Sequence, residues 1–193
     1  MSGEYRSERQ RELKFPITPD VAEAIRAWAR VHLLADPHGG GADGDWYHTT
    51  SIYFDTAGMD TFHRRGSYRR AKYRVRRYGA SDLVVLERKL KARGLVSKRR
   101  SFVPMSELHL LGAALSTEDP WMGAWFGRRV QARQTSPVCQ VSYDRTARVG
   151  TTPTGPMRLT IDENVRAEVH PGSAPELSGL PGIPVAEGLT VLE

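Results

Sequence analysis

Basic residues alternate with apolar residues along several segments of the chain, and this alternation limits the possible folds more than any other feature. In the run Lys72-Tyr73-Arg74-Val75-Arg76, a β-strand would place the basic residues on one face and Tyr73 and Val75 on the other. The same two-residue spacing recurs at Glu12 and Lys14, at Glu87 and Lys89, and at Tyr143 and Arg145. A single charged strand face is usually a solvated one. Repeated faces of this kind instead predict a sheet curled around a charged interior, which would suit a polyanion.

Length and charge set the class of protein. The 193 residues fit one domain, spanning 1–193, and are enough to bury a core. With 28 Lys and Arg against 22 Asp and Glu, the net charge of +6 favours anionic partners such as nucleotides, polyphosphate, nucleic acid or acidic lipid. The single cysteine, Cys139, excludes an internal disulfide and a cysteine-based zinc cluster. No apolar run is long enough to span a bilayer, so we expect a soluble, cytoplasmic protein without a transmembrane segment.

Strands are expected to dominate the fold, with helices at three places. A helix is predicted to begin after Thr18, with Pro19 in its first turn and Val21, Ile25, Trp28 and Leu33 along one face. Two more helical segments are predicted at 104–115 and 120–133. The predicted strands cover 47–55, 68–78, 83–91, 96–102, 138–148, 157–162 and 165–169.

The last residues, Gly188 to Glu193, have the pattern of a strand that has just begun. No cap, turn or polar tail follows them. We therefore expect the C-terminal end to be truncated and the sequence to be a fragment of a longer chain.

The charged strand faces contain both residue types that phosphoryl transfer needs. Lysine and arginine neutralise phosphate oxygens, and carboxylates hold the divalent ion that bridges them. Besides the cations, carboxylates occur at compatible positions of the alternation: Glu12, Glu87, Asp162 and Glu193. Glu12 and Glu87 are thus candidate metal ligands and also candidate structural partners of neighbouring cations. Arg77, Arg88 and Arg99 have the opposite parity and are expected to lie at the surface.

Seven motifs occur in an order that is similar to that of the vacuolar transporter chaperone (VTC) domain. That domain is the polyphosphate polymerase branch of the triphosphate tunnel metalloenzymes. The motifs are Glu12-Leu13-Lys14-Phe15, Ser51-Ile52-Tyr53-Phe54-Asp55-Thr56, Lys72-Tyr73-Arg74-Val75-Arg76-Arg77-Tyr78-Gly79, Glu87-Arg88-Lys89, Lys98-Arg99-Arg100, Tyr143-Asp144-Arg145-Thr146-Ala147 and Arg158-Leu159-Thr160-Ile161-Asp162. The resemblance spans about residues 11–193.

The resemblance implies an α+β fold, an antiparallel β-barrel or triphosphate tunnel with a basic interior and helices packed outside. It implies a polymerase that moves the γ-phosphate of ATP onto a growing polyphosphate chain with Mn²⁺ or Mg²⁺. The family's basic tunnel positions fall on Lys14, Arg74, Arg76, Lys89, Lys98 and Arg145, with Tyr143 beside them. Its metal-binding glutamate falls on Glu193. Lys72 and Arg100 have the parity of the interior and are expected to bind substrate at the tunnel mouth.

Two other functions remain open. In a sibling branch, of adenylate cyclase and thiamine triphosphatase type, the first strand has the pattern Glu-x-Glu-x-Lys. The similar stretch of this chain is Gln10-Arg11-Glu12-Leu13-Lys14. Gln10 favours the polymerase branch, but hydrolysis of an inorganic or nucleoside triphosphate stays possible because water can compete with the acceptor. The second alternative is a non-catalytic polyphosphate-binding module. Nucleic acid is not an expected partner, since the basic residues alternate within strands.

Overall fold

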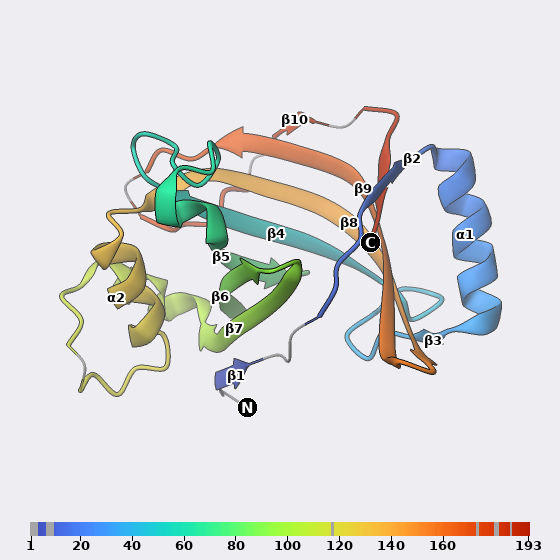
Figure 1. Ribbon diagram of the computed structural model, residues 1–193, viewed down its shortest axis with the longest axis horizontal. Coiled ribbons are helices and arrows are strands. Elements are labelled where there is room, and N and C mark those ends of the chain that lie inside the picture. The colour runs from blue at the N-terminus through green and yellow to red at the C-terminus, as the bar shows by residue number, and fades with distance from the viewer. Residues whose placement is uncertain (1–3, 7–9, 117, 173, 180–181, 186) are drawn as a thin grey trace. The chain divides into compact units, whose positions relative to one another are not determined.

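The computed structural model describes residues 4–6, 10–116, 118–172, 174–179, 182–185 and 187–193 (Figure 1). The chain divides into two compact units, and each is described by itself. Unit 1 comprises residues 1–11, 50–141 and 168–180, and unit 2 comprises residues 12–49, 142–167 and 181–193. Strands β4 (Trp46–Asp55) and β8 (Ser136–Thr152) contribute residues to both units. The single-domain organisation stays a prediction.

Unit 1 is built on an antiparallel sheet. Its strands follow the order β1-β7-β6-β5-β4. Their bounds are β1 (Glu4–Arg6), β5 (Ala71–Tyr78), β6 (Leu83–Ala92) and β7 (Leu95–Pro104). Strands β6 and β7 form a hairpin in which Ala92 pairs with Leu95, so that only Arg93 and Gly94 make the turn. The strands predicted at 83–91 and 96–102 are confirmed.

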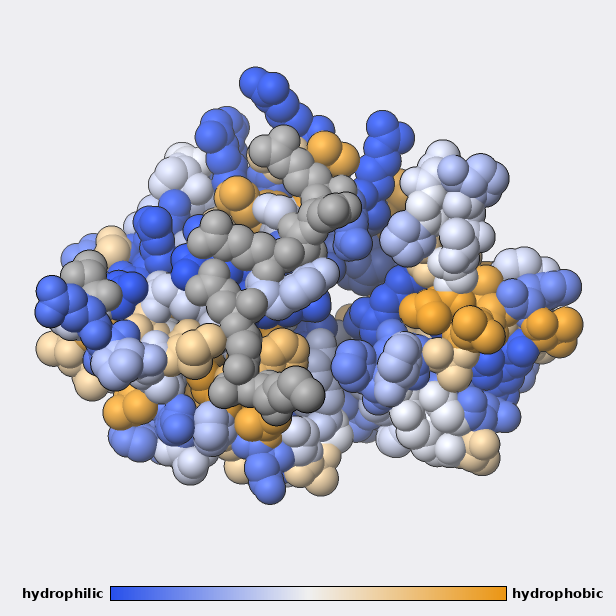
Figure 2. Space-filling model, turned by 90° about the horizontal axis from the view of Figure 1, so that it is seen from below, coloured by the Kyte–Doolittle hydropathy of each residue, from blue (hydrophilic) through white to orange (hydrophobic). Residues whose placement is uncertain are grey.

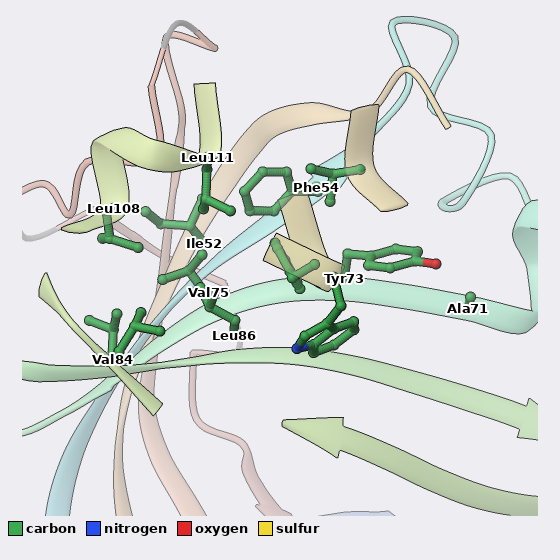
Figure 3. Close-up of a cluster of buried hydrophobic side chains, with 13 residues drawn as sticks. Ile52, Phe54, Ala71, Tyr73, Val75, Val84, Leu86, Leu108 and Leu111 are labelled. Atoms are coloured by element: carbon green, nitrogen blue, oxygen red, sulfur yellow. The ribbon is translucent and has the colours of Figure 1, made fainter. Parts of the chain in front are cut away.

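The hydrophobic core of unit 1 lies between this sheet and its helices. The helices are η1 (Gly66–Arg70), η2 (Met105–Gly112) and α2 (Ala124–Ala132), of which η1 and η2 are 3₁₀ helices. Phe126 of α2 is fully buried and meets the rings of Phe54, Tyr73 and Trp125 edge-on. Figure 3 shows strand residues such as Val75 and Leu86 in the same cluster as Leu108 and Leu111 of η2. The alternation therefore places the apolar residues of β5 in the core, as predicted from the sequence.

Unit 2 contains one α-helix and several strands, of which β9 is the longest that begins in this unit. The bounds are β2 (Phe15–Ile17), α1 (Pro19–His32), β3 (Leu34–Ala35), β9 (Gly155–Val169), β10 (Ile183–Pro184) and β11 (Thr190–Leu192). Strand β11 pairs antiparallel with both β9 and β2. Strand β3 pairs with β8, and β10 pairs with β9. Helix α1 contacts β11 (Figure 1).

Four expectations about secondary structure need correction. No strand contains Glu12 or Lys14, because β2 begins at Phe15. The two strands predicted at 157–162 and 165–169 are one continuous strand, β9, and the segment at 104–115 forms the 3₁₀ helix η2 instead of an α-helix. Helix α1 begins at Pro19 as predicted, but its buried residues are Ala22 and Ala29. Of the residues predicted to line one face, Ile25 and Leu33 are half-buried and Val21 and Trp28 are exposed, so the prediction is only partly confirmed.

The fold is thus mainly antiparallel β with few helices, as predicted. Closure of the sheet into a barrel stays a prediction. Figure 2 shows a face on which hydrophilic side chains predominate and hydrophobic ones form separate groups, in line with the high content of charged residues. Among the described residues, no helix is both long and apolar enough to cross a membrane.

Candidate active site

A row of charged side chains crosses three adjacent strands of unit 1. Arg74 on β5 lies directly opposite Glu87 on β6, and Glu87 lies directly opposite Arg100 on β7. Glu87 forms ion pairs with both arginines, and the distance from Arg100 Nε to Glu87 Oε2 is 2.6 Å. Such cross-strand pairs are fixed by the register of the sheet. We call these three residues the Glu87 row.

Glu87 is held in its charged form. Its side chain is only 2% exposed, and burial by itself would raise its pKa. The positive charges of Arg74, Arg100 and Arg76 outweigh burial and lower the pKa of Glu87 to about 2. The carboxylate therefore neutralises part of a dense cationic region at every physiological pH.

A second row lies next to the Glu87 row on the same strands and contains lysines alone. Lys72 on β5 faces Lys89 on β6, and Lys89 faces Lys98 on β7. Lys72 is exposed, whereas Lys89 and Lys98 are half-buried. We call Lys72, Lys89 and Lys98 the lysine row, which places three positive charges at one position of the register.

Arg76 extends the cationic face of β5 into the protein. It is 4% exposed, and its Nε donates a hydrogen bond to Ser51 Oγ at 3.0 Å. Burial would raise the pKa values of Tyr53 and Tyr78, but the charges of Arg74 and Arg76 lower both pKa values below the usual value of a tyrosine. Arg74 Nη1 also donates to the Tyr53 hydroxyl at 3.3 Å. These tyrosines were not predicted as site residues, and they indicate a strongly positive potential on this face.

Unit 2 has its own cluster, centred on Arg145 of β8. The guanidinium of Arg145 donates two hydrogen bonds to Asp162 of β9, from Nε at 2.6 Å and from Nη2 at 2.7 Å. Burial would lower the pKa of Arg145, but the hydrogen bonds and charge of Asp162 and the charge of Tyr143 raise it well above its usual value. The guanidinium also lies 5.1 Å from the centre of the Tyr143 ring. Arg145 is therefore a permanently charged group held in a fixed orientation.

Glu193 brings Lys14 into the same cluster. Lys14 Nζ lies 2.9 Å from Glu193 Oε2, and Arg145 Nη2 lies 4.0 Å from the same oxygen. The pairing of β11 with β2 and β9 explains the contact, since Glu193 directly follows β11 and Lys14 directly precedes β2. Lys14 and Arg145 thus approach the same carboxylate, although Lys14 lies outside the expected strand. Their role in an active site stays a prediction.

The carboxylates differ in how well they fit a divalent ion. Among the residues that the structure describes, no group of three or more His, Cys, Asp or Glu side chains is placed to hold a metal ion. Glu87 has two arginine partners and Asp162 is taken up by Arg145, so both fit a structural role better. Glu193 is 20% exposed, with Lys14 Nζ at 2.9 Å and Arg145 Nη2 at 4.0 Å from its Oε2. Glu12 is half-buried outside any strand. Mg²⁺ commonly binds one or two protein carboxylates together with phosphate oxygens of the substrate. Glu193 could supply one such carboxylate.

The opposite faces of β5, β6 and β7 are less exposed than predicted. Arg77, Arg88 and Arg99 are all half-buried. The Arg99 guanidinium lies 4.1 Å from the centre of the Trp125 ring, so α2 covers this side of β7. The alternation correctly separates Arg99 from Lys98 and Arg100, but it does not reveal what packs over each face.

Comparisons with known proteins identify the family and the fold. The VTC domain family model matches residues 9–174. A crystal structure of a "putative adenylate cyclase" from Bacillus halodurans has a TM-score of 0.52 at 13% identity, covering 95% of this chain and 79% of that chain. A "putative adenylyl cyclase" from Hippeastrum, described as having a dominant triphosphatase activity, has a TM-score of 0.42 at 13% identity, covering 100% of this chain and 78% of that chain. No curated protein sequence matches.

The structural likeness and the family model support different conclusions. The likeness to the Bacillus halodurans protein shows a shared fold and nothing about substrate, because the sequences have diverged so far. The family model covers most of the chain, including every strand that carries the Glu87 row, the lysine row and Arg145. The protein therefore belongs to the VTC domain family.

Proposed function

We propose that this protein is a polyphosphate polymerase that transfers the γ-phosphate of ATP to a growing polyphosphate chain. The observation that carries the proposal is the lysine row, in which Lys72, Lys89 and Lys98 lie directly opposite one another on adjacent strands. Three ammonium groups at one position of the register can neutralise successive phosphates of a bound polyanion. Family membership supports the same class of substrate.

The chemistry needs positioned cations and no protein nucleophile. A terminal phosphate oxygen of the polyphosphate chain attacks the γ-phosphorus of ATP, the bond from that phosphorus to the β,γ-bridging oxygen breaks, and ADP leaves with the electron pair. Catalysis of this type rests on positioning and on neutralising charge on the transferred group. The groups proposed to contact the reacting phosphates are Lys14, Arg74, Arg76, Lys89 and Arg145. The proposed substrate-binding residues are Lys72, Lys98, Arg100 and Tyr143.

Two features keep these cations ready for the substrate. Glu87 and Asp162 fix arginines in planar, hydrogen-bonded pairs, so little side-chain freedom is lost when a phosphate approaches. Glu193 is the carboxylate proposed to hold Mn²⁺ or Mg²⁺. A bound divalent ion would neutralise additional charge on the phosphate oxygens.

The proposal is tested by incubating the purified protein with ATP and Mn²⁺ or Mg²⁺. Polyphosphate is resolved on a gel, and ADP and free phosphate are assayed. Polyphosphate formed together with ADP supports the polymerase. Free phosphate without polymer indicates a triphosphatase instead, and a folded protein without turnover indicates a polyphosphate-binding module.

One substitution separates a functional from a structural role of the lysine row. Lys89→Met keeps the long aliphatic stem but removes the charge opposite Lys72 and Lys98. We expect turnover to fall by on the order of 10²-fold, because a charge that would neutralise the transferred phosphate is lost. The free energy of unfolding should change by less than about 1 kcal/mol, since the aliphatic stem is kept. Arg166→Gln is the matched control, since it removes one exposed charge from unit 2 and should leave turnover unchanged. Equal turnover in Lys89→Met and the wild type would remove Lys89 from the site.

A further inference from the structure

A cationic cavity lies in unit 1 beside helix α2. Its volume is about 330 Å³, and it is lined by Arg99, Trp125, Arg128, Arg129 and Ala132. The four residues from α2 are spaced i, i+3, i+4 and i+7, so they occupy one face of the helix. Arg99 from β7 completes the lining. The cavity is therefore a product of helical periodicity and of one strand residue, independent of the lysine row.

This cavity and the lysine row use opposite sides of β7. Arg99 lies between Lys98 and Arg100 in the strand, and adjacent side chains of a strand point to opposite faces. The Arg99 guanidinium stacks over the Trp125 ring at 4.1 Å. The indole Nε1 of Trp125 in turn donates a hydrogen bond to Ser101 Oγ at 2.7 Å. Arg99 is thus held in place by a buried aromatic residue with a fixed orientation.

Arginines predominate in the lining of the cavity. Of the described residues that line it, three are arginines and none is an aspartate or glutamate. Arg128 is further positioned by a hydrogen bond from its guanidinium to the carbonyl oxygen of Ser116. A guanidinium group can bind two phosphate oxygens through two parallel hydrogen bonds. Three guanidinium groups around one cavity could therefore bind the same compact, highly charged anion.

We infer that this cavity is a binding site for a condensed phosphate, such as tripolyphosphate or the end of an inorganic polyphosphate chain. A condensed phosphate concentrates several negative charges within the reach of all three arginines. An acidic peptide carries its charges at least one residue apart, about 3.3 Å along an extended chain and on alternating sides, which fits a single cavity of this size less well. The site does not depend on the proposed function, because it uses none of the residues assigned to catalysis.

The test observes Trp125 directly. The indole N–H signal of Trp125 in ¹⁵N-labelled protein is assigned with Trp125→Phe and followed by NMR during titration with tripolyphosphate, without divalent ions. We expect the signal to shift in a saturable manner. No shift at millimolar tripolyphosphate would overturn the inference. An equal affinity for hexaglutamate would overturn the assignment to phosphate.

Paired variants separate local binding from a general effect of charge. Arg128→Gln/Arg129→Gln should weaken the binding seen at Trp125 by at least about tenfold. Arg69→Gln/Arg70→Gln removes the same charge from exposed positions of η1 in the same unit and should leave that affinity unchanged. Equal weakening by both variants would show attraction to net charge without a site. The outcome is independent of any turnover measurement, so failure here leaves the polymerase proposal standing.

Discussion

Glu87 is the residue that balances charge on the cationic face of unit 1. Its pKa is lowered from 4.5 to about 2, since the attraction of Arg74, Arg100 and Arg76 exceeds the cost of burial. A lowered carboxyl pKa contributes stability above the pKa of the unfolded chain and loses it as the pH falls toward the folded pKa. The contribution should therefore be complete above about pH 4.5 and decline between pH 4.5 and 2.

This gives a pH-dependent prediction for Glu87→Gln. Near neutral pH the variant should be less stable than the wild type by on the order of 3 kcal/mol, because two arginines lose their buried partner. Below pH 4.5 the difference should shrink, because Glu87 takes up a proton in the unfolded wild-type chain while it stays charged in the folded protein. Urea denaturation at a series of pH values measures it. A difference that stays constant down to the lowest pH at which the protein is folded would contradict the assigned pKa.

Asp162 plays the corresponding part for Arg145 in unit 2. Both side chains are buried and joined by two hydrogen bonds. Asp162→Asn should lower the free energy of unfolding by about 3 to 5 kcal/mol, because it leaves a buried guanidinium without a countercharge. Glu23→Gln is the control in the same unit, since it breaks an exposed i,i+3 pair with Arg26 and should cost at most about 0.5 kcal/mol. An equal loss of unfolding free energy in the two variants would show that burial does not make the Arg145–Asp162 pair more important than an ordinary surface pair.

At the scale of elements, the turn between β6 and β7 fixes the register of both charged rows. Arg93 and Gly94 have φ values of 51° and 78°, the left-handed conformation that a two-residue hairpin turn with matching twist requires. Nothing lies within 4 Å of a side chain placed at Gly94, so a substitution there acts through the backbone alone. Gly94→Val should therefore destabilise the protein by about 1 to 2 kcal/mol.

The same turn offers a stabilising change and a control. Arg93→Asn should stabilise by up to about 1 kcal/mol, because asparagine tolerates the left-handed conformation better than arginine. Gly112→Ala, at a glycine with equal space and no positive φ, should be neutral or slightly stabilising. Thermal denaturation of the three variants checks the order. Destabilisation by Gly112→Ala as large as that by Gly94→Val would show that lost glycine flexibility in general, not the turn, is responsible.

The elements also show what the sequence could predict. Period-two alternation predicted β5, β6 and β7 and the faces of Arg74, Lys89 and Lys98, because one side of each strand is apolar and register is then strongly specified. It missed the burial of Arg99, since a strand pattern contains no information on the helix that packs over it. It also misplaced the first strand: Lys14 is held by an ion pair with Glu193, a contact between residues far apart in sequence.

At the scale of the whole molecule, the family could be predicted and the reaction could not. The order of seven motifs predicted the VTC domain, which the family model over residues 9–174 confirms. Polymerase, triphosphatase and simple binder would all place cations on the same strands, because each has to neutralise a polyphosphate. They differ in whether a phosphate chain, water or no acceptor attacks the γ-phosphate. The residue types in the sequence do not reveal which of these applies. The reaction is therefore identified by measuring its products.

Salt should separate the two kinds of electrostatic interaction that this chain contains. The ion pairs of Glu87 and Asp162 are buried and little screened, whereas a bound polyphosphate displaces mobile counterions from the basic protein of net charge +6. Raising KCl from about 0.05 to 0.5 M shortens the screening length to a few ångströms. Tripolyphosphate affinity, measured by calorimetry without divalent ions, should then fall by at least about tenfold, while the free energy of unfolding changes by less than about 1 kcal/mol. A parallel loss of affinity and stability would mean that the buried pairs are open to solvent. Affinity that does not depend on KCl would mean that charge is not what recognises the ligand.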